Sequence, residues 1–291
     1  MQRVDIAIVG SGPAGISAAI NAQIRHKSFY LFGADTLSDK VQRSERISNY
    51  PALPEISGPE LNASLMAHLK SANISITEKR ITGIYNMGGY FILLADQEEF
   101  EAKTVILATG VETVRPIAGE RELLGRGVSY CATCDGNLYK GKTIAVVCDN
   151  APMEEEVEYL AALADKVYYE PQFKGSAFSA GNTELLTSPI SQILGENRVS
   201  GIRCRDGREI LVDGIFFIKQ AVSPAVLLRG LAMEERHVAV DRRMSTNIKG
   251  CFACGDCTGT PYQIAKAIGE GNVAAHAAFS YLNQQKAGEQ P

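Results

Sequence analysis

The glycine loop at residues 10–15 constrains the fold of this chain more than any other feature. An apolar segment from Val4 to Val9 leads into Gly-Ser-Gly-Pro-Ala-Gly, and a small-residue segment from Ile16 to Ile24 follows. Gly-x-Gly-x-x-Gly between a strand and a helix indicates a βαβ dinucleotide-binding unit. The three glycines permit a tight turn, close approach of a pyrophosphate to the backbone, and close packing of helix on strand, while the helix N-terminus offers N–H groups to the phosphates. The candidate contacts are Gly10, Ser11, Gly12, Pro13, Ala14 and Gly15.

The strand expected from Ser28 to Phe32 departs from the usual dinucleotide pattern. An acid commonly ends this strand and holds the adenosine ribose, but here the strand runs into Phe32, Gly33, Ala34 and then Asp35. Asp35 could reach the ribose, a backbone contact could replace the acid, or Asp35 could cap a turn. The sequence leaves these interpretations open.

A second feature is the pair Cys131 and Cys134, which is followed directly by Asp135. Two thiols separated by two residues can close a small disulfide ring and exchange rapidly with other disulfides. Half of a zinc site and two buried thiols are the alternatives, but no second Cys/His pair completes a tetrahedral set of ligands. The pattern therefore favours a redox-active disulfide.

Composition limits the remaining possibilities. The chain has 291 residues, 45% of them hydrophobic and 21% charged, with a net charge of −4. This length suffices for one large or two medium domains, and the charge does not suggest nucleic acid or an anionic membrane as a partner. No apolar run reaches the roughly 18 residues that span a bilayer. We expect no signal peptide before the first strand and, because the seven cysteines form no regular framework, a reducing cytoplasm.

Five motifs in order resemble the low-molecular-weight bacterial thioredoxin reductases. They are the opening glycine loop, Asn-Tyr-Pro at 49–51, Ala-Thr-Gly at 108–110, Cys-Ala-Thr-Cys-Asp-Gly at 131–136 and Gly-Asp at 255–256. The resemblance covers nearly the whole chain and implies bound FAD and a homodimer. It also implies an α/β fold with two Rossmann-like, three-layer ββα dinucleotide-binding domains, the second inserted into the first. We expect residues 1–112 and 246–291 to form the FAD domain and residues 113–245 to form the inserted domain, which carries the cysteine pair.

The same resemblance implies roles for individual residues. Cys134 should face the flavin and receive electrons, Cys131 should attack the thioredoxin disulfide, and Asp135 should act as the acid/base, because a departing thiolate needs a proton. Asp256 should bind the ribityl chain, and the helix opening near Gln263 should direct its N-terminus at the flavin, unless it is an ordinary capped helix. The further implied FAD contacts are Phe32, Gly33, Asn49, Ala108, Thr109, Gly110, Gly255, Asp256, Gln263 and Ile264.

A second nucleotide loop, for NADPH, is expected after the cysteine pair in this family, but here it is broken. The strand at 143–147 and a helix ending near Leu163 are present, yet Cys148 and Asn150 stand where the first two glycines belong and Met153 replaces the third small residue. Side chains then occupy the space of a pyrophosphate. After the next strand, Glu170 stands where NADPH-dependent relatives place arginines for the 2′-phosphate. An acid there could instead hold the free ribose of NADH.

With both NADPH motifs lost, the chain resembles the ferredoxin-dependent flavin thioredoxin reductases, a branch without pyridine-nucleotide motifs. The implied reaction passes electrons from reduced ferredoxin through FAD and the Cys131–Cys134 disulfide to thioredoxin. The alternatives are an NADH- or NADPH-dependent thioredoxin reductase with an atypical nucleotide site, an FAD-dependent dithiol oxidase, and a non-catalytic redox-sensing flavoprotein. Candidate basic residues for an acidic ferredoxin are Arg43, Arg46, Lys79, Arg80, Arg242 and Arg243.

Three further cysteines form a Cys-x-x-Cys-x-x-Cys run at Cys251, Cys254 and Cys257. A bacterial iron–sulfur run would need a fourth cysteine where Pro261 stands. We expect buried packing of small residues, with an accessory redox pair as the alternative. No metal site is expected.

Overall fold

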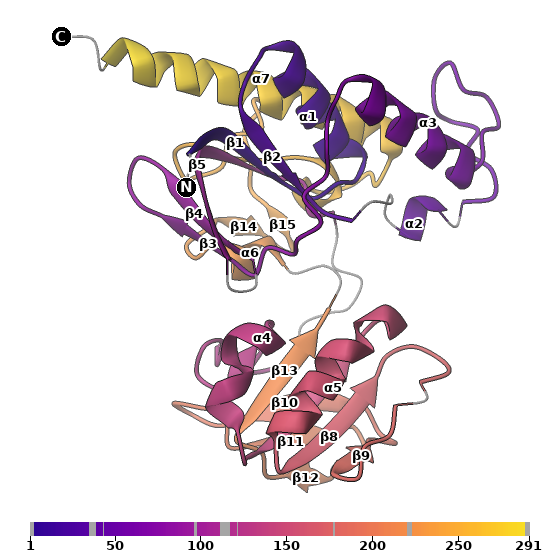
Figure 1. Cartoon of the computed structure of the whole chain (residues 1–291), viewed down its shortest axis with the longest axis vertical. Coiled ribbons are helices and arrows are strands. Elements are labelled where there is room, and N and C mark those ends of the chain that lie inside the picture. Colours follow the sequence, from indigo (N-terminus) through magenta and orange to yellow (C-terminus); the bar gives the residue numbers. More distant parts are fainter. Residues whose placement is uncertain are drawn as a thin grey trace. The chain divides into compact units, whose positions relative to one another are not determined.

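The structure is a computed structural model that describes residues 3–34, 39–42, 44–95, 98–110, 117–120, 122–176, 178–219 and 223–288, without the side chains of 39, 40, 134 and 286–288. The chain divides into two compact units (Figure 1). The first comprises Met1–Val111 and Ser223–Pro291, and the second comprises Glu112–Val222. Each unit is built on a largely parallel sheet with helices, so the predicted α/β class with two Rossmann-like domains is confirmed.

The first unit contains a six-stranded sheet in the order β2-β1-β5-β4-β3, with β16 paired to β5. β1 pairs in parallel with β2 and β5, β16 pairs in parallel with β5, and β4 runs antiparallel to its neighbours. The strand bounds are β1 Val4–Val9, β2 Phe29–Phe32, β3 Gly83–Asn86, β4 Phe91–Ala95, β5 Glu98–Leu107 and β16 Cys251–Ala253. β1 is almost wholly apolar and buried, as expected of a parallel strand covered on both faces.

Helices α1 (Pro13–Ile24) and α7 (Ile264–Gly288) run side by side in the first unit (Figure 1). Gly271 allows this close approach, because a Cβ there would lie 2.1 Å from the Ala14 carbonyl oxygen. The Ser17 hydroxyl donates to the Ile268 carbonyl oxygen at 2.8 Å and ties the helices together. The core beneath them combines residues from both ends of the chain. The other helices of this unit are α2 Asp39–Gln42, α3 Gly58–Ser71, α6 Pro224–Leu227 and η3 Gly255–Thr258.

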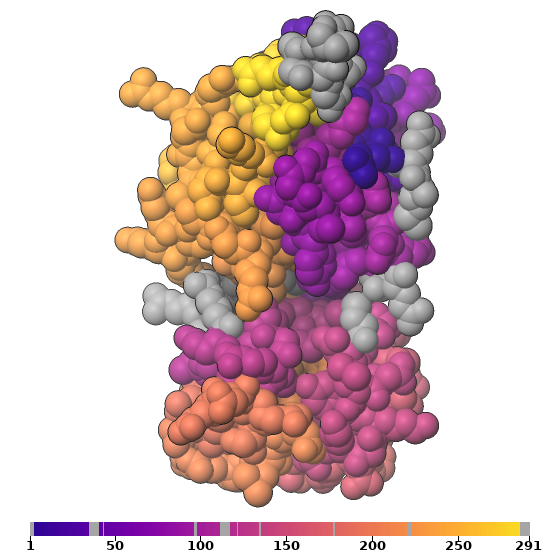
Figure 2. Space-filling view, turned by 90° about the vertical axis from the view of Figure 1, so that its left-hand side faces the viewer, coloured from indigo at the N-terminus to yellow at the C-terminus, as the bar shows by residue number. Residues whose placement is uncertain are grey.

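The return of the chain to the first unit lies at residue 223, whereas the sequence placed it at residue 246. Residues 223–245 contain α6 and the hairpin of β14 (Met233–Glu234) and β15 (His237–Val238). This segment is bonded within the first unit: Leu228 bridges Ile84, and the Asn247 side chain donates to the Gly230 carbonyl oxygen. Figure 2 shows the orange part of this segment against the purple residues of the first unit. The expected border at residue 246 therefore falls inside the first unit.

The second unit has a parallel five-stranded sheet in the order β6-β13-β7-β8-β9 and an antiparallel three-stranded sheet, β10-β11-β12. Helix α5 packs on the parallel sheet over a core that includes Val146, Leu160 and Phe216. The strands are β6 Val128–Ser129, β7 Thr143–Cys148, β8 Lys166–Pro171, β9 Thr183–Leu185, β10 Ile190–Leu194, β11 Gly201–Cys204, β12 Glu209–Ile210 and β13 Gly214–Ile218. The helices are α4 Ala132–Asp135, η1 Gly136–Tyr139, η2 Ala151–Met153 and α5 Glu154–Leu163. In the part of the chain described, no helix is both long and apolar enough to cross a membrane.

Candidate functional site

The residues predicted to contact FAD gather at one edge of the first sheet. Gly10 follows β1, Gly33 follows β2, Ala108 follows β5 and Gly255 comes soon after β16. These four strands are parallel neighbours, so their carboxyl ends share one edge. Ligands of open α/β sheets bind outside that edge. The structure therefore brings the sequence-predicted loops together.

Two of the three loop glycines are required by packing. Gly10 has a φ of +117°, and a Cβ there would lie 2.2 Å from the Ala108 carbonyl oxygen. A Cβ at Gly15 would lie 1.8 Å from the Gly10 carbonyl oxygen. Both contacts are with backbone, which cannot yield as a side chain can.

Gly12 differs from its two neighbours and provides a test of whether FAD fits here. Its φ is −72°, and no described atom lies within 4 Å of the position of a Cβ. It precedes Pro13, the first residue of α1, and among the described residues no side chain caps this helix. The space beside the helix N-terminus is thus open and lined by backbone, which is what a pyrophosphate needs. The residues fit the cofactor.

The loop after β2 is fitted closely to the glycine loop. A Cβ at Gly33 would lie 2.2 Å from the Ser11 Oγ, and that hydroxyl donates to the Ala34 carbonyl oxygen at 2.8 Å. Phe32 is buried against Phe100, with ring centroids 5.0 Å apart, so only its backbone is available to a ligand. Asp35, the possible ribose contact, lies outside the described residues.

The other predicted contacts come from distant parts of the sequence. Asn49 Nδ2 donates to Gln263 Oε1 at 2.6 Å, which joins two of them directly. Ile264 is the first residue of α7. Thr109 and Gly110 follow β5 beyond Ala108, and Gly110 has a φ of +70°. Asn49, Gln263 and Ile264 therefore belong to one corner of the first unit.

Glu270 and Lys266 of α7, which were not predicted from the sequence, hold η3, the turn that carries Asp256. Glu270 Oε2 accepts from the Gly255 amide at 2.9 Å and from Thr258 Oγ1 at 2.8 Å. Lys266 Nζ donates to the Gly255 carbonyl oxygen at 3.0 Å and lies 3.1 Å from Glu270 Oε2. The sequence feature that could have revealed them is a lysine and a glutamate four residues apart in a segment of small residues.

The run of Cys251, Cys254 and Cys257 consists of free, buried thiols. Burial raises the pKa of Cys251 to about 12 and that of Cys257 to about 11. The Cys257 thiol donates to the Cys254 carbonyl oxygen at 3.2 Å. Among the described residues, no group of three or more His, Cys, Asp or Glu is placed to hold a metal ion.

The redox segment of the second unit is organised around Ser129. Cys131 is disulfide-bonded, lies next to α4 and is buried. The structure does not describe the side chain of Cys134. Ser129 Oγ donates to Asp135 Oδ2 at 2.7 Å and accepts from the Cys131 amide at 3.1 Å. Asp135 is therefore fixed toward the residues that precede the disulfide. Ser129 is not among the site residues predicted from the sequence.

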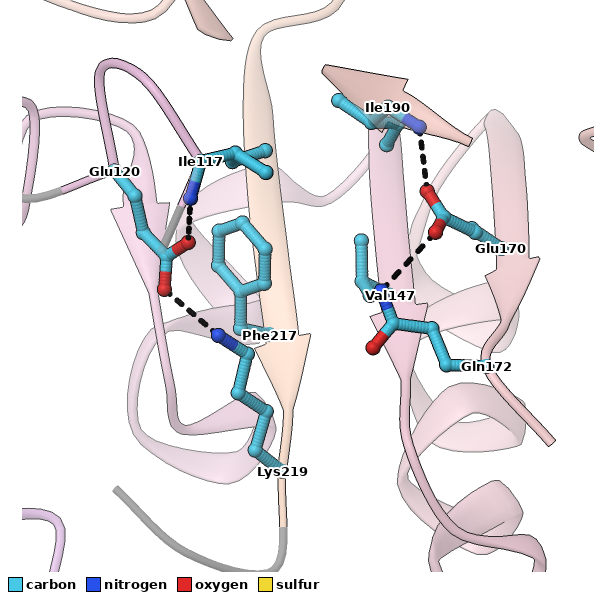
Figure 3. Close-up of a pocket in the computed structure, with 8 residues that line it drawn as sticks. All are labelled: Ile117, Glu120, Val147, Glu170, Gln172, Ile190, Phe217 and Lys219. Atoms are coloured by element: carbon cyan, nitrogen blue, oxygen red, sulfur yellow. Dashed lines mark hydrogen bonds and ion pairs between the residues drawn. The ribbon is translucent and has the colours of Figure 1, made fainter. Parts of the chain in front are cut away.

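A buried ion pair, Lys219 with Glu120 (Figure 3), contacts Tyr130, the residue before Cys131. Lys219 Nζ lies 2.8 Å from Glu120 Oε1, and their side chains are 2% and 0% exposed. Glu120 Oε2 accepts from the Ile117 amide at 2.9 Å, and the Tyr130 hydroxyl donates to Glu120. Removing one partner of a buried pair leaves an uncompensated charge, so the pair fixes the Glu120 carboxylate, and Tyr130 is positioned by its hydrogen bond to that carboxylate. The signal in the sequence was a single lysine after the apolar strand β13.

The second nucleotide loop is filled by its own side chains. Cys148 ends β7, and its thiol donates to the Asn150 carbonyl oxygen at 3.2 Å. Burial raises the pKa of Cys148 to about 11. Glu154, at the start of α5, accepts from the Tyr169 hydroxyl at 2.8 Å and from Ser176. A carboxylate thus occupies the helix N-terminus, where a dinucleotide would place its phosphates.

Glu170, the acid that could hold the ribose of NADH, is also engaged within the second unit (Figure 3). It is buried, its Oε2 accepts from the Ile190 amide at 2.8 Å, and its Oε1 accepts from Gln172 Nε2 at 3.1 Å. Both oxygens bond to the protein's own donors. The observation that supported NADH in the sequence is therefore explained by local structure.

A dinucleotide cradle in one unit and a disulfide-bearing segment beside a carboxylate in the other define the class of dinucleotide-dependent disulfide oxidoreductases. The chain belongs to the pyridine nucleotide-disulphide oxidoreductase family, which it matches over residues 4–148 and 183–271. The unmatched residues between them, 149–182, include Asn150, Met153, Glu154 and Glu170 but not Cys148.

Individual relatives place the chain more precisely within this family. The chain is 30% identical to thioredoxin reductase of Bacillus subtilis (strain 168) over 96% of this chain and 95% of that protein. A ferredoxin-flavin thioredoxin reductase from Clostridium acetobutylicum is 48% identical, with a TM-score of 0.90 and coverage of 99% and 100%. A thioredoxin reductase from Gloeobacter violaceus is 29% identical, with a TM-score of 0.78 and coverage of 98% and 95%. The chain is therefore a thioredoxin reductase-type flavoprotein, a disulfide reductase whose cofactor is FAD.

Proposed function

We propose that this enzyme takes electrons from reduced ferredoxin and delivers them to the disulfide of thioredoxin. The observation that carries the proposal is the occupied second nucleotide site, where Cys148 of the loop, Glu154 of α5 and Glu170 of β8 are bonded to the protein's own groups. A nicotinamide dinucleotide would have to displace these contacts and place its phosphates beside a carboxylate. The likeness to the Clostridium acetobutylicum ferredoxin-flavin enzyme supports the same donor.

The residue roles follow the chemistry of each group. Cys131 and Cys134 form the disulfide that accepts the electron pair, and Cys131 attacks the substrate disulfide. Asp135 exchanges a proton with the thiols, and its carboxylate is oriented by Ser129. When bound, FAD would accept single electrons in succession and deliver two of them to the disulfide.

The first unit holds the cofactor by its backbone. Gly12 and the N-terminus of α1 bind the pyrophosphate, the loops at Gly33 and Ala108 line the adenosine side, and Asp256 binds the ribityl chain. Lys266 and Glu270 keep Asp256 in place through η3. The remaining proposed contacts are Gly10, Ser11, Pro13, Ala14, Gly15, Phe32, Asn49, Thr109, Gly110, Gly255, Gln263 and Ile264.

The partner surface and the assembly are part of the same proposal. Of the basic residues considered for ferredoxin, Lys79 is paired with Glu98 at 2.7 Å and Arg46 is paired with Glu55. A homodimer, as the resemblance implies, is tested by light scattering coupled to gel filtration of the purified flavoprotein.

The decisive experiment compares electron donors under anaerobic conditions. The purified flavoprotein is mixed with reduced ferredoxin, NADPH or NADH, while the visible flavin band and the thiols of thioredoxin are followed. We expect ferredoxin to bleach the flavin and to support thioredoxin reduction, and both nicotinamides to do neither. Rapid bleaching by NADPH would contradict the proposal.

The matched control is Cys134→Ser. This variant should bind FAD and be reduced by ferredoxin, but it should not reduce thioredoxin, because a single thiol cannot complete the exchange. Oxidation of small dithiols with stoichiometric peroxide would favour a dithiol oxidase. Absence of turnover with every donor would favour a redox sensor.

A further inference from the structure

Ser129 occupies a junction between the candidate acid and the backbone of the redox segment. Its hydroxyl lies 2.7 Å from Asp135 Oδ2, 3.1 Å from the Cys131 amide nitrogen and 3.2 Å from the Cys131 carbonyl oxygen. Ser129 is itself buried, in the short strand β6, where it pairs with Phe216 of β13. Its contacts are therefore set by the sheet and not by solvent.

A serine hydroxyl has one hydrogen to donate and two lone pairs that can accept. The Cys131 amide uses one lone pair, so the hydrogen must choose between Asp135 and the Cys131 carbonyl oxygen. When Asp135 is ionised it can only accept, and the hydrogen points to it. When Asp135 is protonated it can donate to the second lone pair of Ser129, and the Ser129 hydrogen turns to the Cys131 carbonyl oxygen. Every group keeps a partner in both states.

We propose that Ser129 is a positioning residue for proton transfer, whose hydroxyl reorients each time Asp135 gains or loses a proton. This inference rests on the proposed function for the role of Asp135 as acid and base. A half-buried carboxyl that changes charge during turnover ordinarily loses a hydrogen bond in one of its two states. Ser129 removes that cost because it serves as donor to one state and acceptor to the other.

The proton balance requires Asp135 to change state during each exchange. Asp135 takes the proton of Cys131, the Cys131 sulfur forms a bond to one substrate sulfur, and the substrate S–S bond breaks. The second substrate sulfur leaves as a thiolate and takes the proton from Asp135. Cys134 then gives its proton to Asp135 and attacks Cys131, and the released substrate thiolate takes that proton. Two electrons and two protons pass to the substrate, and the enzyme disulfide is restored.

The charged and titratable groups near this cluster include groups on η1, on α5 and beside Tyr130. Tyr139 of η1 interacts electrostatically with Asp135: burial first, and then the charge of Asp135, raise the pKa of Tyr139, while Arg198 lowers it and Asp213 raises it. From α5, the Tyr159 hydroxyl accepts from Asn137 Nδ2 at 3.4 Å. On the side of Tyr130, Glu120 and Lys219 neutralise each other. The Ser129 hydroxyl is thus a direct polar contact that the described residues of the second unit make with the Asp135 carboxylate.

The test follows reduction of the enzyme disulfide by dithiothreitol from pH 5 to pH 9, with thiol trapping and mass analysis. It uses the FAD-loaded protein and needs neither ferredoxin nor thioredoxin, so it remains valid if the proposed donor is wrong. In Ser129→Ala we expect a rate about tenfold lower, and the acid limb of the pH profile should move up by about one pH unit. Ser129→Thr keeps the hydroxyl and should restore the wild-type pH midpoint. An unchanged midpoint in Ser129→Ala would overturn the proposal.

A double-mutant cycle separates positioning from a merely structural role. If Ser129 acts through Asp135, Ser129→Ala should have little further effect in the Asp135→Asn background. An equal fold-change in both backgrounds would instead show an independent, structural effect. Should Ser129→Ala fail to fold, Ser129→Cys takes its place, because a thiol fills the volume and is only a weak donor.

Discussion

The two nucleotide loops of this enzyme share a layout and differ in what fills them. In the first unit, β1 leads through Gly10, Gly12 and Gly15 into α1, and the space beside Gly12 is open. In the second unit, β7 leads through Cys148 and Asn150 into the turn η2 and then α5, and Glu154 occupies the helix N-terminus. Both units keep their sheets and their buried cores. The fold thus survives loss of the ligand loop, because its stability comes from apolar burial and not from the dinucleotide.

The difference also shows why binding is lost more easily than structure. A pyrophosphate needs backbone N–H groups without side chains over them and without neighbouring negative charge. The second loop departs on both counts. Cys148 and Asn150 carry side chains where glycines are expected, and three glutamates stand in the first turn of α5. Those same glutamates suit the helix dipole, so the changes that harm phosphate binding do not harm the helix. The comparison can be tested by exchanging features between the loops.

The largest effect is expected from Gly15→Val in the first loop. The new Cβ would lie 1.8 Å from the Gly10 carbonyl oxygen, so backbone must move, at a cost of about 3 kcal/mol or more. Thermal unfolding and the flavin-to-protein absorbance ratio should show an unstable protein without flavin. The counterpart Met153→Val should cost less than about 1.5 kcal/mol, because that position already holds a side chain. Equal losses in both variants would refute the comparison.

Gly12→Val should separate binding from folding. The Cβ position is open and φ is −72°, so we expect stability within about 0.5 kcal/mol of wild type. FAD affinity should fall on the order of 100-fold, as measured by titration of the apoprotein, because the side chain enters the pyrophosphate space. Asn150→Val in the second loop should leave FAD affinity unchanged. A Gly12→Val protein with normal affinity would show that the phosphates lie elsewhere.

Alkaline pH should weaken both units through their buried thiols. The pKa of Cys148 and of Cys257 is raised from 9.0 to about 11 by burial. Below pH 9 both folded and unfolded chains keep these protons; between pH 9 and about 11 only the folded chain does, so stability falls as pH rises. At pH 10 the loss should be about 1 kcal/mol for each thiol, as seen in urea unfolding at pH 8 and pH 10. Cys148→Ala should remove only the part of this alkaline loss of stability that arises in the second unit.

The smallest effect is expected from restoring small residues to the second loop. A variant with Cys148→Gly, Asn150→Gly and Met153→Ala should still show no NADPH binding by calorimetry, because Glu154 and Glu170 remain in place. Adding Glu154→Gln to this variant tests the charge separately from the bulk. Tight NADPH binding by the first variant would show that side-chain volume alone closed the site.

The sequence predicted the backbone-level features of this protein well. Glycines at fixed spacing after an apolar strand have few structural uses, so the first loop, its helix and the α/β class could be inferred without coordinates. The cofactor, the enzyme class and the family followed from short motifs and are confirmed. Contiguous motifs carry this information because their geometry is local.

Tertiary structure alone decided which side chains support the site. Glu120 and Lys219 are 99 residues apart, and Asn49 and Gln263 are 214 apart, so only the fold brings them into contact. The border at residue 223 depends on contacts of Leu228 with Ile84 and of Gly230 with Asn247, which no local pattern encodes. From the sequence, Glu170 was a candidate to bind a ribose, but in the folded protein it accepts a hydrogen bond from the Ile190 amide. The glycine loop is determined by local backbone geometry, whereas the partners of a buried polar group depend on the whole chain.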